Sequence, residues 1–130
     1  MEFKFSEELF LQNKTGSYLY HKYAKDLHIV DYHCHLVAKE MYEDKGFDNL
    51  GEMWLAHDHY KWRARRTFGI DEYYITGDAD YYSKYLKFAE ILPRLLGNPI
   101  YIWCALELKR YFDIDQPLGP DNADEIYHQT

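Results

Sequence analysis

The chain lacks the features that would place it in a membrane or outside the cell. In its 130 residues no uninterrupted apolar run approaches the roughly 20 residues that a helix needs to span a bilayer. The first residues, MEFKFSEELF, carry acids and hold no apolar core of a secretory signal. Its two cysteines, Cys34 and Cys104, lie far apart and show no ligand spacing. We therefore expect a cytoplasmic protein that contacts no membrane and keeps both thiols reduced.

Positive charge is also scarce. Only 15 Lys and Arg stand against 22 Asp and Glu, which gives a formal net charge of −7 with His neutral. A duplex-binding domain is usually basic, so we expect no nucleic-acid partner. Neither a phosphate-binding loop nor a dinucleotide fingerprint is present. An acidic chain can still bind an anionic small molecule, because a local basic cluster sets the sign of the charge inside a cleft.

Aromatic side chains are abundant, with 14 Tyr, 7 Phe and 3 Trp in a chain that is 47% hydrophobic. Such a composition is globular and can bury a large area per residue. The length suits one compact domain, whereas a complete eight-stranded barrel typically needs about 250 residues.

Capping residues, acidic first turns and glycine stops predict helices along most of the chain. The first expected helix begins at Ser6, and the second runs from Thr15 to about Lys25. Further helices are expected over residues 37–45, over residues 49–68 with a break near Asp58, over residues 81–96 with a break at Pro93, and over residues 100–112. Another is expected to begin at residue 122.

Residues 27–36, LHIVDYHCHL, are the exception. Ile29 and Val30 favour a short strand, which must pair with strands outside these residues because a lone strand leaves its backbone groups without partners. On a strand, side chains alternate between faces, so His33 and His35 would point the same way. Two converging imidazoles are two ligands for a divalent cation such as zinc, which needs at least one more. The alternative is a histidine pair with no ligand role.

A second informative stretch, HDHYKWRARR (57–66), gathers positive charge in a chain of negative net charge. On a helix, His59, Arg63 and Arg66 share one face. An arginine can donate two parallel hydrogen bonds to a carboxylate, and a His-Tyr pair beside it could bind hydroxyls or transfer protons. The alternative is a solvated amphipathic helix whose aromatic residues cover the core while its arginines pair with nearby acids.

Together these segments resemble uronate isomerase (glucuronate isomerase), a family of the amidohydrolase superfamily. The likeness rests on IVDYHCHL (29–36), FDNLGEMWLAHDHYKWRARRTFGIDE (47–72), TGDAD (76–80) and NPIYIWCALELKRYFDI (98–114), in the family's order. The His-x-His pattern alone is shared by a whole superfamily, whereas DHYKWRA is specific.

The resemblance implies roles for individual residues. His33 and His35 would bind the divalent metal, zinc in the first instance, at the end of the first barrel strand. His59 and Tyr60 would lie at the substrate as catalytic and substrate-binding residues. Arg63 joins them as a substrate-binding residue on the grounds of its charge and spacing.

The implied fold is α/β, namely the N-terminal part of a distorted (β/α)8 barrel with extra helices. Residues 1–130 would be a single incomplete segment of that barrel, mostly α-helical with one short strand. The family's remaining metal ligand is an Asp near the last strand, which this segment cannot contain, so we expect the segment alone to be inactive.

The implied activity converts the hexuronic acids D-glucuronate and D-galacturonate to D-fructuronate and D-tagaturonate, in sugar-acid catabolism, and we expect a homo-oligomer. Two alternatives stay open. A metal-dependent hydrolase of the same superfamily would use the His pair to activate water. A non-catalytic helical module would instead bind an acidic partner through its basic helix.

Overall fold

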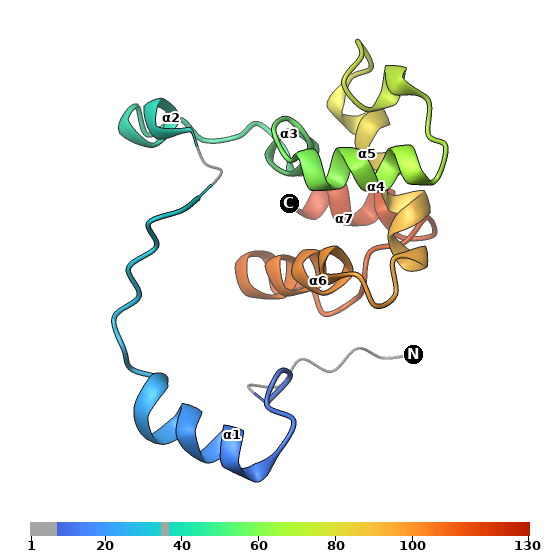
Figure 1. Ribbon diagram of the computed structural model, residues 1–130. Coiled ribbons are helices and arrows are strands. Elements are labelled where there is room, and N and C mark those ends of the chain that lie inside the picture. Colours follow the sequence, from blue (N-terminus) through green and yellow to red (C-terminus); the bar gives the residue numbers. More distant parts are fainter. Residues whose placement is uncertain (1–7, 35–36) are drawn as a thin grey trace. The chain divides into compact units, whose positions relative to one another are not determined.

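The structure, a computed structural model, describes residues 8–34 and 37–130. The chain divides into two compact units, Met1–Cys34 and His35–Thr130. All regular secondary structure within the described ranges is helical (Figure 1), which confirms the prediction of a mostly helical chain. No helix in these ranges is both long enough and apolar enough to cross a bilayer.

The described part of the first unit holds one helical segment. Helix α1 covers Lys14–Leu19 and continues as a π-helical turn, η1, over Tyr20–Ala24. The side chain of Asn13, rather than the expected Thr15, caps α1 by accepting a hydrogen bond of 2.8 Å from the Gly16 N–H. The helix expected from Ser6 begins outside the described residues, and those that follow form a turn.

The strand predicted over residues 27–36 is wrong for its described part. Residues 27–34 are irregular, and residues 35 and 36 lie outside the described ranges. Ile29 and Val30 are largely exposed, so no neighbouring surface holds them in a pleated arrangement. A strand is stabilised by backbone hydrogen bonds to another strand, and the described ranges contain none to pair with.

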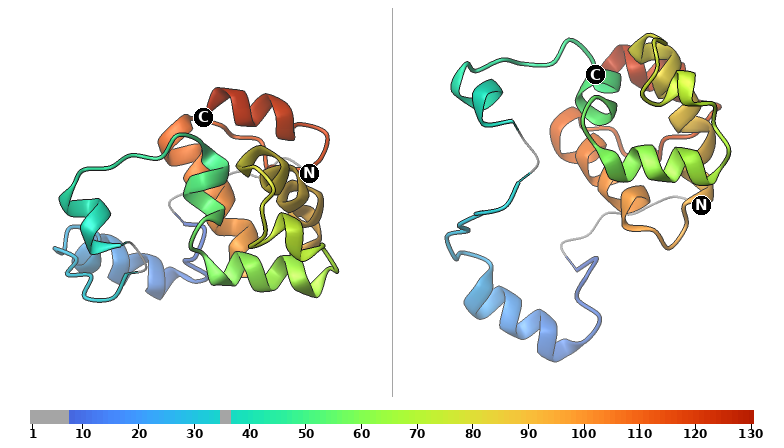
Figure 2. Two further views of the ribbon diagram at one scale, coloured as in Figure 1. Left: turned by 90° about the horizontal axis from the view of Figure 1, so that it is seen from above. Right: turned by 45° about the horizontal axis from the view of Figure 1, so that its top comes forward.

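The second unit is a helical bundle. Figures 1 and 2 show α3 to α7 gathered together, with α5 packed against α3, α4 and α7. Its elements are α2 (Ala38–Tyr42), α3 (Leu50–Leu55), α4 (His59–Thr67), η2 (Glu72–Tyr74), α5 (Tyr81–Ile91), η3 (Leu92–Arg94), α6 (Pro99–Phe112) and α7 (Ala123–Gln129).

Polar side chains cap the starts of α4, α5 and α6. Asp58 separates α3 from α4 and caps α4, which confirms the expected break. Asp80 caps α5 through a hydrogen bond of 2.8 Å from the Ser83 N–H. Pro93 lies in the 3₁₀ turn η3 that ends α5, because a proline cannot donate the next helical hydrogen bond. Asn98 caps α6 ahead of a proline at its first position.

The core of the bundle is aromatic and aliphatic. Phe88 of α5 is fully buried and meets the edge of the Trp54 ring at 6.1 Å between centroids. Tyr85 is equally buried, and its hydroxyl donates to the Ala123 carbonyl, which joins α7 to α5. Burying a large apolar side chain stabilises a fold by about 1.5–3 kcal/mol. The thiol of Cys104 lies in this core, where burial raises its pKa to about 12.

A substitution at Gly51 tests how closely α3 packs on α5. A Cβ added at Gly51 would lie 2.5 Å from the carbonyl oxygen of Tyr81. Gly51→Ala should therefore lower the free energy of unfolding by about 1–3 kcal/mol, although alanine is the better helix former. Gly46→Ala is the matched control, because a Cβ there meets nothing within 4 Å. Urea denaturation measures both variants, and equal midpoints would contradict this packing.

Candidate functional site

The candidate site lies at the start of α4, directly after its cap. One carboxylate oxygen of Asp58 accepts hydrogen bonds from the backbone N–H groups of Tyr60 and Lys61, at 2.9 and 3.2 Å. These groups have no partner within the helix itself, so the cap stabilises the first turn. It thereby fixes the backbone that carries His59 and Tyr60, and both of these side chains are exposed.

The structure brings together the three residues predicted to contact substrate. The rings of His59 and Tyr60 stack with centroids 4.5 Å apart and planes inclined by 30°. The guanidinium carbon of Arg63 lies 5.9 Å from the centroid of the Tyr60 ring. Within the described part of the chain, Arg63 has no acidic ion-pair partner. An imidazole, a phenol and a guanidinium are thus presented together to solvent.

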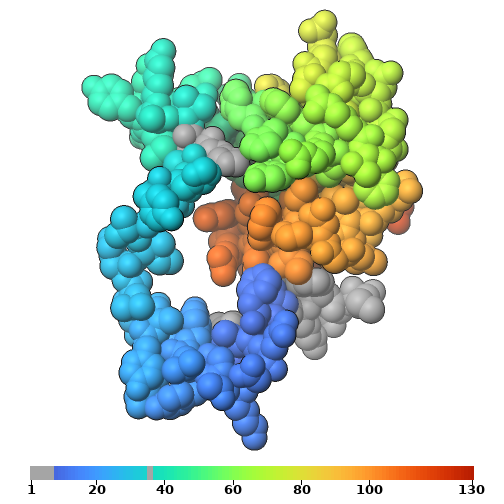
Figure 3. All heavy atoms as spheres, in the orientation of Figure 1, coloured from blue at the N-terminus to red at the C-terminus, as the bar shows by residue number. Residues whose placement is uncertain are grey.

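Tyr60 and Arg63 also line a groove between α4 and the start of α6. Its volume is about 340 Å³. Figure 3 shows atoms of these two segments, green and orange, meeting on one face of the bundle. Trp103 lies in the groove with half of its surface exposed. The groove is lined by Tyr60, Arg63, Ala64 and Thr67 from α4 and by Asn98, Pro99, Ile100 and Trp103 from α6 and its cap.

Two of the four positive charges of α4 face the interior, which the sequence did not indicate. Lys61 is 8% exposed, and its ammonium lies 2.7 Å from the second carboxylate oxygen of Asp58. Arg65 is fully buried and donates one hydrogen bond of 2.7 Å to the Tyr74 carbonyl. Burial lowers the pKa of Arg65 to about 10. Both residues therefore belong to the packing of the helix.

Arg66, which was expected to share a face with His59 and Arg63, is engaged elsewhere. Its guanidinium forms a two-pronged ion pair with Glu72, with Nε 2.9 Å from Oε2. The hydrogen bond from Arg66, with another from Thr76, lowers the pKa of Glu72 to about 2. This pair matches the alternative in which the arginines neutralise nearby acids, but only for Arg66.

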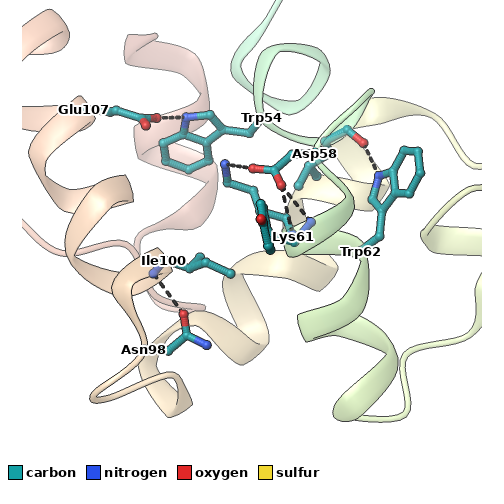
Figure 4. Close-up of polar contacts among 9 residues, drawn as sticks. Trp54, Asp58, Lys61, Trp62, Asn98, Ile100 and Glu107 are labelled. Carbon is teal, nitrogen blue, oxygen red and sulfur yellow. Dashed lines mark hydrogen bonds and ion pairs between the residues drawn. The ribbon is translucent and has the colours of Figure 1, made fainter. Parts of the chain in front are cut away.

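The Asp58 carboxylate stays charged because of its partners. Partial burial alone would raise its pKa, but the hydrogen bond and charge of Lys61 outweigh that effect. Backbone N–H groups of α4 add to the stabilisation of the charged form, so the pKa of Asp58 lies below its ordinary value. Figure 4 shows the carboxylate between the Lys61 ammonium and the backbone of the first turn.

The predicted metal ligands are described only in part. His33 is exposed in the irregular segment, and its backbone N–H donates to the Asp31 carboxylate at 3.1 Å. His35 lies outside the described residues, so the shared orientation of the two imidazoles stays a prediction. Across the described ranges there is no group of three or more His, Cys, Asp or Glu that could hold a metal ion.

Asn98 and Trp103 are the groove residues that sequence reasoning did not single out. They lie about forty positions from Tyr60, and no spacing relates the two segments. Only the packing of the start of α6 beside α4 brings them together. The one available signal was that both fall within a stretch, residues 98–114, that carries the family resemblance.

Comparison with known proteins assigns the chain to a class of sugar-acid isomerases. The family model described as glucuronate isomerase matches residues 1–130, which is the whole chain. The chain therefore belongs to the glucuronate isomerase family.

Individual relatives agree with this assignment. The uronate isomerase of Caldicellulosiruptor bescii is 57% identical over 124 residues, which cover 95% of this chain and 27% of the relative. That of Clostridium perfringens is 52% identical over 123 residues, which cover 95% of this chain and 26% of the relative. This chain thus spans about a quarter of the length of these relatives.

A solved structure shows the same fold. The crystal structure of uronate isomerase from Thermotoga maritima superposes with a TM-score of 0.89 at 38% identity, covering 98% of this chain and 28% of that one. The helices described here therefore match part of a uronate isomerase. Because the described ranges contain no strand, the barrel expected from the family stays a prediction about a longer protein.

Proposed function

We propose that this chain is part of a uronate isomerase that converts D-glucuronate to D-fructuronate and D-galacturonate to D-tagaturonate. The observation that carries the proposal is the match of the family model to all 130 residues. The exposed group of His59, Tyr60 and Arg63 adds support, since its side chains suit a sugar acid. Because the chain covers 27% of its relative, the other active-site residues would come from elsewhere in the protein.

The proposed reaction moves a proton between C2 and C1 of the open-chain sugar acid through an enediol-like intermediate. His59 and Tyr60 would transfer a proton or hold a substrate hydroxyl, because an imidazole and a phenol can each donate and accept a hydrogen bond. The Arg63 guanidinium would bind the substrate carboxylate through paired hydrogen bonds. Its place beside the Tyr60 ring would set carboxylate and hydroxyl recognition side by side.

A divalent metal, with zinc as the first candidate, would be held by His33 and His35. Imidazole nitrogens are ordinary zinc ligands, and the exposed His33 is compatible with such a role. When bound, the ion would polarise substrate oxygens. Two imidazoles do not complete a site, so at least one ligand would come from a distant part of the protein.

We also propose a cytoplasmic location and assembly as a homo-oligomer.

Replacing His59 tests its catalytic role. In the full-length protein, His59→Asn should lower kcat with both uronates by about a hundredfold or more, the usual contribution of a positioned acid or base. His57→Asn is the matched control, because His57 is also exposed and lies 3.9 Å from Glu40, away from the groove. Ketone product is measured directly, which also separates isomerisation from hydrolysis. Unchanged turnover in His59→Asn would end its assigned role.

Two arginines on α4 provide a matched test of carboxylate binding. Arg63→Gln should raise KM for both uronates by about tenfold or more, because a charged hydrogen bond to the substrate is lost. Arg66→Gln should leave KM within about twofold, since its guanidinium is paired with Glu72. Steady-state kinetics on the full-length variants measure both values. Equal KM values for the two variants would contradict the proposal that Arg63 binds the substrate carboxylate.

Metal content tests the His33–His35 proposal separately from activity. The full-length protein, purified without chelator, should contain a divalent ion. His33→Ala or His35→Ala should lose most of it, because each variant removes one ligand and leaves the site incomplete. His28→Ala, on the same exposed segment, should retain the ion. Elemental analysis of the three variants gives the answer. Equal content in all of them would contradict the assignment.

A further inference from the structure

We propose that Lys61 is a positioning residue, which acts from inside the bundle to hold the start of α4 where His59 and Tyr60 lie. This inference rests on the proposed function, since it concerns the same site. Lys61 does not reach the groove, and its side chain is 10% exposed. Its influence on the site would therefore pass through the Asp58 carboxylate.

Asp58 divides its two oxygens between the helix backbone and Lys61. Oδ1 accepts from the N–H groups of Tyr60 and Lys61, while Oδ2 lies 2.7 Å from the Lys61 ammonium. The same carboxylate thus contacts the backbone of a site residue and a buried cation. A movement of the cation would move the acceptor on which the Tyr60 backbone depends.

Capping a helix does not require a buried cation beside the capping residue. Asn49 caps α3 by accepting from the Glu52 N–H at 2.9 Å, and Asn98 caps α6 by accepting from the Ile100 N–H at 3.0 Å. Both do so with a neutral amide. Because burying an ammonium group is costly, a charged cap with a buried partner needs a reason beyond starting the helix.

Lys61 also lies close to a residue of the neighbouring helix α3, which in turn contacts α6. Its ammonium lies 5.9 Å from the centroid of the Trp54 ring of α3. The Trp54 indole N–H donates to the Glu107 carboxylate of α6, the helix that forms the other wall of the groove. Figure 4 shows this chain of contacts running from Glu107 through Trp54 to Lys61 and Asp58. These contacts connect the start of α4, through Trp54 of α3, to α6.

Removing the ammonium should release the first turn. Without Lys61, the half-buried Asp58 carboxylate loses its ion-pair partner and would turn towards water. The Tyr60 N–H would then lose its acceptor. His59 and Tyr60 would remain present but no longer occupy one position, and a displacement of about 1 Å can cost a hundredfold in rate.

The test uses the full-length protein with Lys61→Met, which keeps most of the length of the side chain and removes its charge. Lys87→Met is the matched control, because Lys87 and Glu90 form an ion pair of the same spacing and the same 2.7 Å distance on the surface. We expect kcat to fall by about tenfold to a hundredfold in Lys61→Met with KM changed by less than about threefold. Lys87→Met should match the wild type.

A combined variant separates positioning from general loss of stability. If Lys61 acts through His59 and Tyr60, then Lys61→Met should cause little further loss of kcat in a background that carries both His59→Asn and Tyr60→Phe. Losses that multiply would overturn the proposal. If Lys61→Met does not fold, Lys61→Gln replaces it, because glutamine keeps a polar end near the Asp58 carboxylate but carries no charge. The same kcat loss and the same non-additivity are expected.

A crystal structure of the full-length Lys61→Met protein provides a reading that needs no activity. The His59 and Tyr60 rings should leave their stacked arrangement or become disordered relative to wild type, whereas Lys87→Met should leave them in place. Unmoved rings in Lys61→Met would overturn the positioning role whatever the kinetics show. Absence of ketone product from wild-type protein would instead reject the proposed function, and the structural comparison would still decide the role of Lys61.

Discussion

Asp58 receives three hydrogen bonds on its two carboxylate oxygens, and the course of the chain between α3 and α4 depends on them. The backbone bonds start α4 at His59, and the bond to Lys61 draws the same side chain towards the core. Trp62 adds a further link, because its indole N–H donates to the Leu55 carbonyl at the end of α3. Side-chain hydrogen bonds thus tie together the two helices on either side of a short break, and a supported backbone is what the proposed site at the start of α4 needs.

Much of this could be predicted from the sequence because the signals are local. The break at Asp58, the cap at Asp80 and the interruption at Pro93 each follow from one residue and its immediate neighbours. The face that each cation of α4 takes could not be predicted. Lysine and arginine are seldom buried, so the sequence favours the surface for all of them. Lys61 is buried against Asp58, and Arg65 is buried with a hydrogen bond to the Tyr74 carbonyl.

The strand and the groove show the other limit, which is dependence on distant partners. Ile29 and Val30 have the local preference of a strand, but a strand exists only where another strand offers its hydrogen bonds, and residues 27–34 are irregular. Trp103 reaches the groove only because the start of α6 packs beside α4. Neither outcome is encoded in the spacing of residues within one segment.

These two points combine at the surface of α4. The sequence shows a cluster of four positive charges in a chain of net charge −7. In the structure, Lys61 is paired with Asp58 and Arg66 with Glu72, while Arg65 is buried. The cluster therefore presents a single guanidinium, that of Arg63, to the groove beside Tyr60. One arginine in a defined place suits a ligand with a single carboxylate better than a diffuse basic patch would, and a sugar acid is such a ligand.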